Sequence, residues 1–370
     1  MAKMISPRSI SFISNIRLSL CFWYTSAAIV QRNRVRVKRH RAALAYGARL
    51  GYPFPHIMKA DLHLHSRFSD GGLWPAELAV AANTAGMDAV ALTDHDNLAG
   101  SAEFIAAAER FGMRAWVATE IDCIDTEIGY KSEILAYFPK GQYRHTEDLL
   151  RTVKRERRTM VASLFASAAS VFGRKDIDFP EYERSRLSGR PDGAPPIGPE
   201  DLRYGKTDIY FALKQAGVLA SGMGYRRFKK VYLKSGLLSR TKVSKLKLSD
   251  VCKVVLKDGG YLTVPHIGHE FGDDPDRIRN QVARLDMLMA HFRALGVGAI
   301  ESYAYGRKQE AAINEFVAER ARAHGFFITY GSDDHGPASG KRTIGLFYGN
   351  FAGFPHEQAI SSTPAENGKA

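Results

Sequence analysis

Cysteine is scarce in this chain of 370 residues, which holds only Cys21, Cys123 and Cys252 and has no C-x-x-C spacing. Disulfide frameworks and cysteine zinc sites both depend on closely or regularly spaced cysteines. The sequence therefore argues against a disulfide-stapled fold and against a thiolate metal site. It fits a reducing compartment, and we expect the cytoplasm.

Several catalytic motifs are missing as well. The chain has no G-x-S-x-G nucleophile elbow, no P-loop of the form G-x-x-x-x-G-K-[ST] and no H-E-x-x-H zinc motif. The pairs Gly222-x-Gly224 and Gly296-x-Gly298 lack the third glycine and the acidic residue of a dinucleotide site. Serine hydrolases, P-loop nucleotide hydrolases and dinucleotide-dependent enzymes therefore fit poorly.

Acidic residues are absent from residues 1–57, which carry a net charge of +10. The apolar stretch 9–30 contains Arg17, whereas a transmembrane helix needs about 20 predominantly apolar residues. The basic run 32–41 follows this stretch, which is the reverse of a signal peptide. We expect Met58 to begin the folded domain, after a disordered leader or a mis-assigned start. The alternative is organellar targeting, because an Arg-rich, acid-free leader resembles a transit peptide; membrane association is not expected.

The rest of the chain divides by charge. Segments 58–139 and 261–370 carry −8 and −2, whereas 140–260 carries +13. Acidic groups gather where cations bind, and basic groups gather where phosphates bind. An acidic framework interrupted by a basic insert therefore suits a metal-dependent enzyme that acts on an anionic substrate.

From Met58 onward, apolar strand-like runs alternate with helix-like segments. Strands are predicted at 57–62, 88–92, 115–118, 134–138, 261–264, 299–302, 326–330 and 344–347. Helices are predicted at 75–85, 101–111, 275–295 and 308–324, and within the insert at 146–170 and 207–216. This alternation predicts a parallel α/β sheet, open or closed into a barrel. The expected domains are a barrel over 58–139 and 259–350, an inserted, mainly helical cap over 140–258, and a C-terminal tail over 351–370.

Polar side chains gather at or just after the carboxyl ends of these strands. His63 and His65 lie on the same face of one strand, because alternate residues point the same way, so the two imidazoles can chelate one metal ion. The carboxyl edge of a parallel sheet is where active sites assemble in such folds. The candidate metal ligands are His63, His65, Asp70, His95, Glu120, His266, Asp333 and His335.

Eight ligands are too many for one ion and enough for two or three divalent ions. Nitrogen and oxygen donors without thiolate suit Zn, Mn or Fe. Metals about 3.5–4 Å apart can lower the pKa of a bridging water and neutralise charge on a phosphoryl group. Asp94 and Asp96 are expected to orient imidazoles rather than to bind metal, and His269 is the rival of His266 as a ligand.

The stretch "DLHLHSRFSDGGLWPAELAVAANTAGMDAVALTDHDNLAG" resembles the opening of the PHP (polymerase and histidinol phosphatase) phosphoesterases, and "YLTVPHIGHE" and "ITYGSDDHG" resemble the family's later motifs. The resemblance covers residues 58–138 and 259–350. It implies a distorted (β/α)7 TIM-like barrel, a trinuclear metal centre and hydrolysis of phosphate esters. The implied ligands are His63, His65, Glu120 and Asp333 for one metal, Glu120 and His266 for a second, and Asp70, His95 and His335 for a third. Asp333, Glu120 and His335 are then the catalytic residues, acting through metal-bound water.

The insert resembles that of one branch, the nucleoside 3′,5′-bisphosphate phosphatases and related 5′→3′ oligonucleotide exonucleases. In that branch, basic residues of a helical insertion bind phosphate. The stretch "GKTDIYFALKQAG" resembles a helix of this insertion, with Lys206 where the branch has an arginine and Asp208 where it has a histidine. The candidate substrate-binding residues here are Lys206, Arg226 and Arg227.

Two further positions depart from the branch. The branch has a histidine ligand on the strand after Glu120, where this chain has Glu133, so the second metal site either survives with an altered metal preference or is lost. The usual His-Pro is His266-Ile267.

The sequence as a whole predicts a metal-dependent phosphoesterase that hydrolyses nucleoside 3′,5′-bisphosphates or the 5′ ends of short oligonucleotides. One alternative is a small-metabolite phosphatase, for example for histidinol phosphate. The other is a non-catalytic nucleic-acid-binding accessory protein, which the basic insert favours and the eight retained ligands oppose. No stable protein partner is implied.

Overall fold

The computed structural model describes residues 58–336, 339, 341 and 343–355. The predicted leader, residues 1–57, lies outside the described residues, and so does most of the predicted C-terminal tail. Among the described residues, no helix combines the length and the apolar character needed to cross a membrane.

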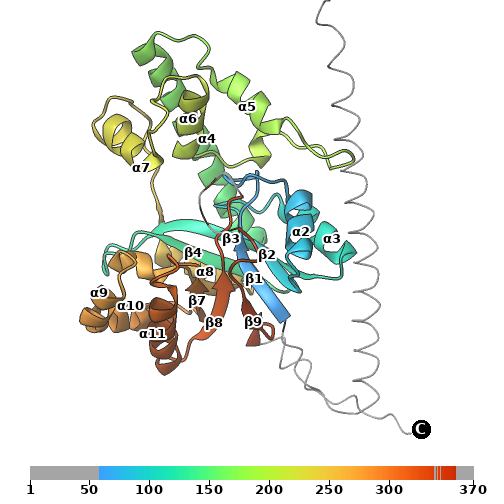
Figure 1. Ribbon diagram of the computed structural model, residues 1–370, viewed down its shortest axis with the longest axis vertical. Helices are drawn as coiled ribbons and strands as arrows, with labels where there is room; N and C mark the ends of the chain where they lie inside the picture. Colours follow the sequence, from blue (N-terminus) through green and yellow to red (C-terminus); the bar gives the residue numbers. More distant parts are fainter. Residues whose placement is uncertain (1–57, 337–338, 340, 342, 356–370) are drawn as a thin grey trace, which may run out of the picture. The chain divides into compact units, whose positions relative to one another are not determined.

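A curved sheet forms the centre of the described region. Seven of its strands are β1 (Met58–Leu64), β2 (Ala89–Leu92), β3 (Arg114–Ile124), β4 (Glu133–Phe138), β6 (Tyr261–Val264), β7 (Ala299–Tyr303) and β8 (Phe327–Gly331). They follow the order β8-β7-β6-β4-β3-β2-β1, and β4 runs antiparallel to both of its neighbours. After β1, the backbone N–H of His65 donates to the carbonyl of Asp334 at 2.9 Å, which brings the end of β8 back beside β1. The predicted distorted seven-stranded barrel is confirmed (Figure 1).

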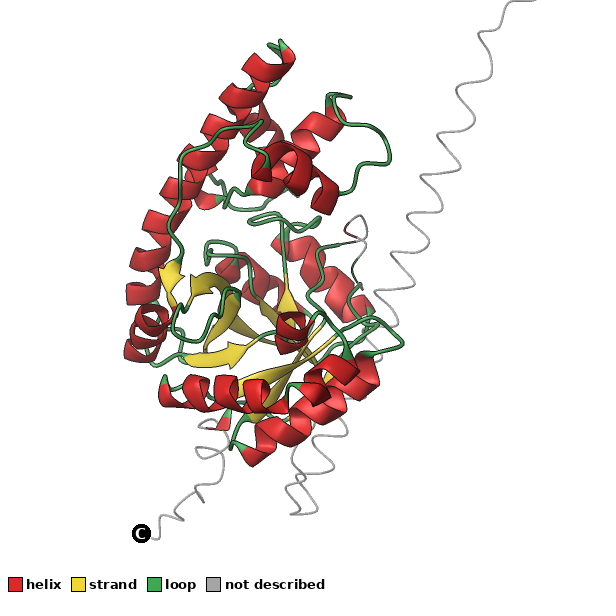
Figure 2. Ribbon diagram, turned by 90° about the vertical axis from the view of Figure 1, so that its left-hand side faces the viewer, coloured by secondary structure: helices red, strands yellow, loops and turns green. Residues whose placement is uncertain are grey.

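Helices cover the outside of this barrel. They are α2 (Pro75–Thr84), α3 (Ser101–Arg110), α8 (Leu248–Lys257), α9 (Pro275–Asn280), α10 (Val282–Ala294) and α11 (Glu310–Ala323). The predicted helix 275–295 is divided between α9 and α10, because Gln281 leaves helical geometry with φ −113° and ψ 32°. Apolar faces of α8, α10 and α11 share one buried core with strands β3, β4, β6 and β7. Figure 2 shows the strands enclosed by helices.

The basic insert supplies a second group of helices. These are α4 (Arg144–Phe172), α5 (Phe179–Leu187), η1 (Pro199–Asp201), α6 (Lys206–Gln215), α7 (Tyr225–Phe228) and η2 (Lys229–Lys234), followed by the short strand β5 (Leu246–Lys247), which pairs with β3. The long helix α4 connects the two parts: Leu150 packs into the barrel core, and residues from Met160 to Ala168 pack into the core of the insert. Phe68 and Trp74, from the loop after β1, are buried in this second core. The insert therefore packs onto the loop that follows the carboxyl end of β1. Helix α8, although inside the predicted cap range, packs with the barrel.

The predicted strand 344–347 was wrong. Gly345 has φ +90° and interrupts it, and the strand forms later as β9 (Gly349–Phe351), antiparallel to the first residues of β1. A glycine is needed at 349, because a Cβ there would lie 2.0 Å from the ring of Tyr330. Phe351 and Phe354 are buried against Trp116 and other aromatic rings, so the first residues of the predicted tail pack with the barrel.

Candidate metal centre

The eight predicted ligands and Glu133 meet at one edge of the barrel. His63 and His65 come from the end of β1, and their ring centroids are 5.1 Å apart because alternate strand residues share a face. The other ligands come from the loop after β1 (Asp70), the segment after β2 (His95), β3 (Glu120), the start of β4 (Glu133), the segment after β6 (His266) and the segment after β8 (Asp333 and His335). Because β4 is antiparallel to its neighbours, its first residue reaches the same edge as the last residues of the parallel strands.

Three groups of donor atoms lie within this edge, and in each group all the donor atoms are within 4.8 Å of one another. The groups are His63, His65, Glu120 and Asp333 (group 1); Glu120, Glu133 and His266 (group 2); and His65, Asp70, His95 and His335 (group 3). Glu120 belongs to groups 1 and 2, and His65 belongs to groups 1 and 3, so the three groups form one continuous cluster. The family resemblance implied these sets with two differences: it left Glu133 open as a member of group 2, and it placed His65 in group 1 alone.

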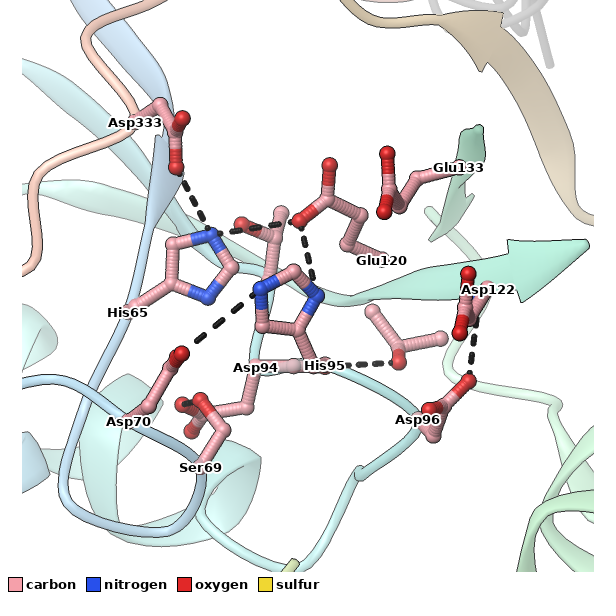
Figure 3. A network of polar contacts seen from close by, with 12 residues as sticks. His65, Ser69, Asp70, Asp94, His95, Asp96, Glu120, Asp122, Glu133 and Asp333 are labelled. Carbon is pink, nitrogen blue, oxygen red and sulfur yellow. Dashed lines mark hydrogen bonds and ion pairs between the residues drawn. The ribbon is translucent and has the colours of Figure 1, made fainter. Parts of the chain in front are cut away.

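Glu120 occupies the middle of the cluster. Its Oε2 lies 3.4 Å from Nε2 of both His63 and His65 and 3.0 Å from Nδ1 of His95, while its Oε1 lies 3.0 Å from Nε2 of His266. Figure 3 shows His65 and His95 facing this carboxylate, with Asp70 on the far side of His95 and Glu133 beside Glu120. A carboxylate placed in this way can bridge two cations.

The donor atoms fit divalent metal ions. Buried polar atoms normally have hydrogen-bond partners, so a set without partners needs an explanation. Seven buried ligand atoms have no hydrogen-bond partner among the described residues: His63 Nε2, His65 Nδ1, His65 Nε2, Asp70 Oδ1, His95 Nδ1, His266 Nδ1 and Asp333 Oδ1. A neutral imidazole has one free lone pair and an ionised carboxylate has several, so these side chains offer the nitrogen and oxygen donors of Zn, Mn or Fe sites.

Carboxylates and imidazoles of the cluster also pair with one another. Burial opposes ionisation, yet the charges of His63 and His95 hold the pKa of Glu120 well below its usual value. Burial likewise opposes the ionisation of Asp333, and the charges of Lys341 and His335 hold its pKa well below normal. Burial, together with the charges of His335 and His95, lowers the pKa of His65 well below its usual value. Burial opposes protonation of His63, yet the charges of Glu301 and Glu120 raise its pKa well above its usual value, so a cation that binds this imidazole must displace a proton.

His266 reaches the cluster in a strained conformation. Its backbone has φ +30° and ψ 45°, which is a rare region for a residue with a side chain. Its rival His269 stacks on it at a centroid distance of 4.6 Å, but Nδ1 of His269 is paired with Asp273 at 2.7 Å. Of His266 and His269, His266 is the one that belongs to a ligand group.

The prediction that Asp94 and Asp96 orient imidazoles was wrong. Asp94 accepts hydrogen bonds from the hydroxyls of Ser66 and Ser69, and burial raises its pKa to about 6 against these hydrogen bonds. Asp96 pairs with Arg157 of the insert at 2.9 Å. Both carboxylates point away from the histidines because they stabilise the loop after β1 and the contact with α4.

Three residues that the sequence did not single out touch the ligands. Glu301 of β7 accepts a hydrogen bond of 2.8 Å from Nδ1 of His63. Asp333 Oδ2 receives a hydrogen bond of 3.0 Å from the hydroxyl of Tyr303 and an ion pair from Lys341. Glu301 and Tyr303 lie in β7 and follow the expected polar pattern at a strand end.

The predicted substrate-binding residues are more scattered. Lys206 is partly buried at the start of α6, whereas Arg226 and Arg227 are exposed on α7. Burial and the charges of Arg240 and Arg157 lower the pKa of Lys206. Asp208 is buried and pairs with Arg186, so one positive charge of the insert is neutralised within it.

Known proteins share this architecture. Residues 61–181 match the model of the PHP domain. The 3′,5′-nucleoside bisphosphate phosphatase of Chromobacterium violaceum is 27% identical over 295 residues, which cover 77% of this chain and 90% of that protein.

Two solved structures share the fold. One is a structure from Chromobacterium violaceum, described as an amidohydrolase with bound sulfate and no metal. It matches with a TM-score of 0.59 and 23% identity, and the match covers 76% of this chain and 89% of that chain. The other is a structure from Bifidobacterium adolescentis, described as a candidate metal-dependent phosphoesterase. It matches with a TM-score of 0.56 and 22% identity, and the match covers 78% of this chain and 91% of that chain. The domain match therefore identifies a PHP domain within residues 61–181, and the two solved structures show that their fold extends over most of this chain.

Proposed function

We propose that this protein is a phosphatase that removes a phosphate group from nucleoside 3′,5′-bisphosphates. The observation that carries the proposal is the convergence of three ligand groups, joined by Glu120 and His65, at one buried edge of the barrel. The bisphosphate phosphatase of Chromobacterium violaceum, which aligns over most of both chains, supports this substrate class.

Groups 1, 2 and 3 would hold two or three divalent ions; Glu120 offers two oxygens to groups 1 and 2, whereas the single lone pair of a neutral His65 would serve either group 1 or group 3. Bound ions of this kind lower the pKa of water and neutralise the charge that develops on a phosphoryl group. Because the second group contains two carboxylates and one imidazole, we propose that Glu133 keeps this site functional in place of a histidine.

Asp333 is held so that one oxygen faces the cluster. Tyr303 and Lys341 both contact Oδ2, which leaves Oδ1 directed at His65 and His63, at 3.2 and 3.6 Å from their Nε2 atoms. A ligand fixed in this way loses little conformational entropy when a cation binds. We assign Asp333 to the catalytic centre on this basis, together with Glu120, which shares group 1, and His335, whose Nδ1 lies 3.2 Å from Oδ1 of Asp333.

The basic insert would recognise the anionic substrate. Lys206 lies among positive neighbours that lower its pKa, so a phosphate beside it would relieve the repulsion between these charges. Arg226 and Arg227 are exposed, and exposed side chains of this kind would attract the substrate over a longer range. Lys206 is therefore the first residue of the insert to test as a phosphate contact.

Substrate profiling of the purified full-length protein tests the proposal. After chelation and reloading with Mn²⁺ or Zn²⁺, release of phosphate would be measured from adenosine 3′,5′-bisphosphate, a 5′-phosphorylated oligonucleotide and histidinol phosphate. We expect the bisphosphate to give the highest kcat/KM and the Asp333→Ala variant to give no turnover.

Two results would contradict this assignment. Failure to hydrolyse any phosphate ester, with less than one metal ion bound per chain, would favour a nucleic-acid-binding accessory protein. Comparable turnover of the oligonucleotide and of histidinol phosphate would keep the phosphoesterase and remove the preference for bisphosphates.

A further inference from the structure

Glu301 is a buried carboxylate between two ligand groups. It lies in the middle of β7 and is 1% exposed. Its Oε1 accepts a hydrogen bond of 2.8 Å from Nδ1 of His63, and its Oε2 accepts one of 3.0 Å from the backbone N–H of His266. One side chain therefore contacts a residue of group 1 and a residue of group 2.

The neighbouring strand leaves space for this contact. A Cβ at Gly331 of β8 would lie 2.1 Å from Oε1 of Glu301 and 2.3 Å from Cβ of His63. Distances this short are not tolerated between non-bonded atoms, so any larger residue at 331 would push Glu301 and His63 apart. Gly331 has an ordinary φ, and its small size is what the site requires.

The two hydrogen bonds have different consequences. A carboxylate only accepts hydrogen bonds, so Nδ1 of His63 carries a proton, and in the neutral ring the lone pair is then on Nε2. That Nε2 faces Glu120 and Asp333 and has no hydrogen-bond partner among the described residues. The second hydrogen bond holds the backbone N–H of His266, whose φ of +30° needs compensation from its surroundings.

We propose that Glu301 is a positioning residue that prepares both groups 1 and 2 for their metals. It fixes the tautomer and ring orientation of His63, and it holds the strained backbone that presents His266. Among the described residues, Glu301 forms its hydrogen bonds with His63 and His266 and with no residue that belongs only to group 3. The metal affinity of group 3 should therefore not depend on Glu301. This inference rests on the proposed metal-dependent function.

The substitution Glu301→Gln separates this role from simple packing. A glutamine has nearly the same shape, but one of its two terminal atoms is an NH₂ donor. If the NH₂ faces His63, the imidazole must become an acceptor at Nδ1, and its proton moves to the metal-facing Nε2. If the NH₂ faces His266 instead, the strained backbone N–H loses its acceptor. Either orientation weakens a metal group without creating a cavity.

Direct metal binding by the full-length protein tests the proposal without any substrate. Chelated protein would be titrated with Mn²⁺, and free Mn²⁺ would be followed by electron paramagnetic resonance. We expect Glu301→Gln to weaken up to two of the Mn²⁺ sites by about 10- to 100-fold, the range typical of residues that support metal ligands, and to leave the remaining site unchanged.

Asp258→Asn is the matched control. Asp258 is another buried carboxylate that accepts backbone hydrogen bonds, from His145 and Thr146, but it caps α4 and contacts no ligand in the described structure. This variant should lower the melting temperature of the metal-free protein while leaving its Mn²⁺ affinities within about twofold of the original.

The possible outcomes separate the two hypotheses. If the unmodified protein binds no Mn²⁺, the proposed function fails. If the unmodified protein binds Mn²⁺ and Glu301→Gln binds it equally well, or if Asp258→Asn loses as much affinity, the role of Glu301 is overturned. Selective loss in Glu301→Gln supports it.

Discussion

The guanidinium of Arg186 donates a hydrogen bond of 2.6 Å to the backbone carbonyl of Ser69, the residue immediately before the group 3 ligand Asp70. The same nitrogen donates to the carbonyl of Arg67 at 2.8 Å, and the other terminal nitrogen pairs with Asp208 of α6. Arg186 thus joins two helices of the insert to the loop after β1. The position of the candidate metal ligand Asp70 therefore depends on the insert.

Replacing Arg186 with lysine should weaken group 3. A lysine carries its three donors on one nitrogen, so it cannot reproduce contacts that Arg186 makes through two separate nitrogens. We expect Arg186→Lys to lower the affinity of one metal site by about tenfold, and kcat with it, because Asp70 loses its fixed position. Metal content after dialysis and steady-state kinetics would measure both effects. Arg184→Lys is the control, since Arg184 lies on the same helix, is exposed and pairs with Glu181; equal losses in both variants would contradict the prediction.

The identity of the residue at 133 should set the metal preference of group 2. In the proposed site, Glu133 and Glu120 would supply oxygen ligands and His266 one nitrogen, which is a harder donor set than two imidazoles and one carboxylate. We expect Glu133→His to raise the affinity for Zn²⁺ relative to Mn²⁺ by about tenfold. Competition titrations with the two metals would measure this ratio. Glu127→His adds an imidazole at an exposed position nearby in sequence and should leave the ratio unchanged; a parallel change there would show that the effect is not local.

Lys206 and Asp333 should affect different kinetic constants. If Lys206 contacts a substrate phosphate, Lys206→Ala removes one charge-assisted hydrogen bond, and KM should rise about tenfold with little change in kcat. Asp333→Ala should abolish kcat, because its Oδ1 faces the centre of the ligand cluster. Lys230→Ala, at an exposed position of η2, is the control for net charge. A lower kcat with unchanged KM in Lys206→Ala would contradict the assigned role.

Strand ends were the predictable part of the site. Several apolar runs end in His, Asp or Glu, for example the runs before His63 and before Asp333. Because parallel strands end at the same edge of a sheet, this pattern indicated that the polar residues lie at one edge of the barrel. The structure brings those residues within one cluster, including Glu133 from an antiparallel strand. Helix positions followed from apolar spacing, and α4 and α6 lie within two residues of their predicted bounds.

Contacts across the barrel were not predictable from local pattern. Glu301 looks like an ordinary strand residue, and its partner His63 is 238 residues away in sequence. Asp94 and Asp96 sit on either side of His95, yet their carboxylates turn toward serines and toward an arginine of the insert. The curvature of the sheet and the packing of the insert determine which residues these side chains contact.

An ion pair away from the site gives a prediction about pH. Asp286 of α10 accepts two hydrogen bonds from Arg320 of α11, at 2.9 and 2.6 Å, and a third contact of 3.2 Å from Nε2 of His324. Slight burial opposes its ionisation, but the hydrogen bonds from Arg320 and His324 lower the pKa of Asp286 below its usual value. The pair connects two helices on the outside of the barrel.

Asp286→Asn should therefore destabilise the protein only where the carboxyl is ionised. A pKa that is lower in the folded than in the unfolded protein adds stability above the unfolded value, near 4, and that stability disappears as the pH falls through the folded value. We expect the variant to lose less than about 1 kcal/mol at pH 7, since the pair is partly exposed, and the difference from the unmodified protein to shrink below about pH 4. Urea unfolding at both pH values would measure this difference in the free energy of unfolding.

Asp276→Asn is the control. The partner of Asp276, Arg279, is 3.7 Å away on an exposed face, so this variant should change stability much less at either pH. A difference for Asp286→Asn that grows as the pH falls would reverse the expected sign and show that the ionised carboxyl does not stabilise the contact between α10 and α11.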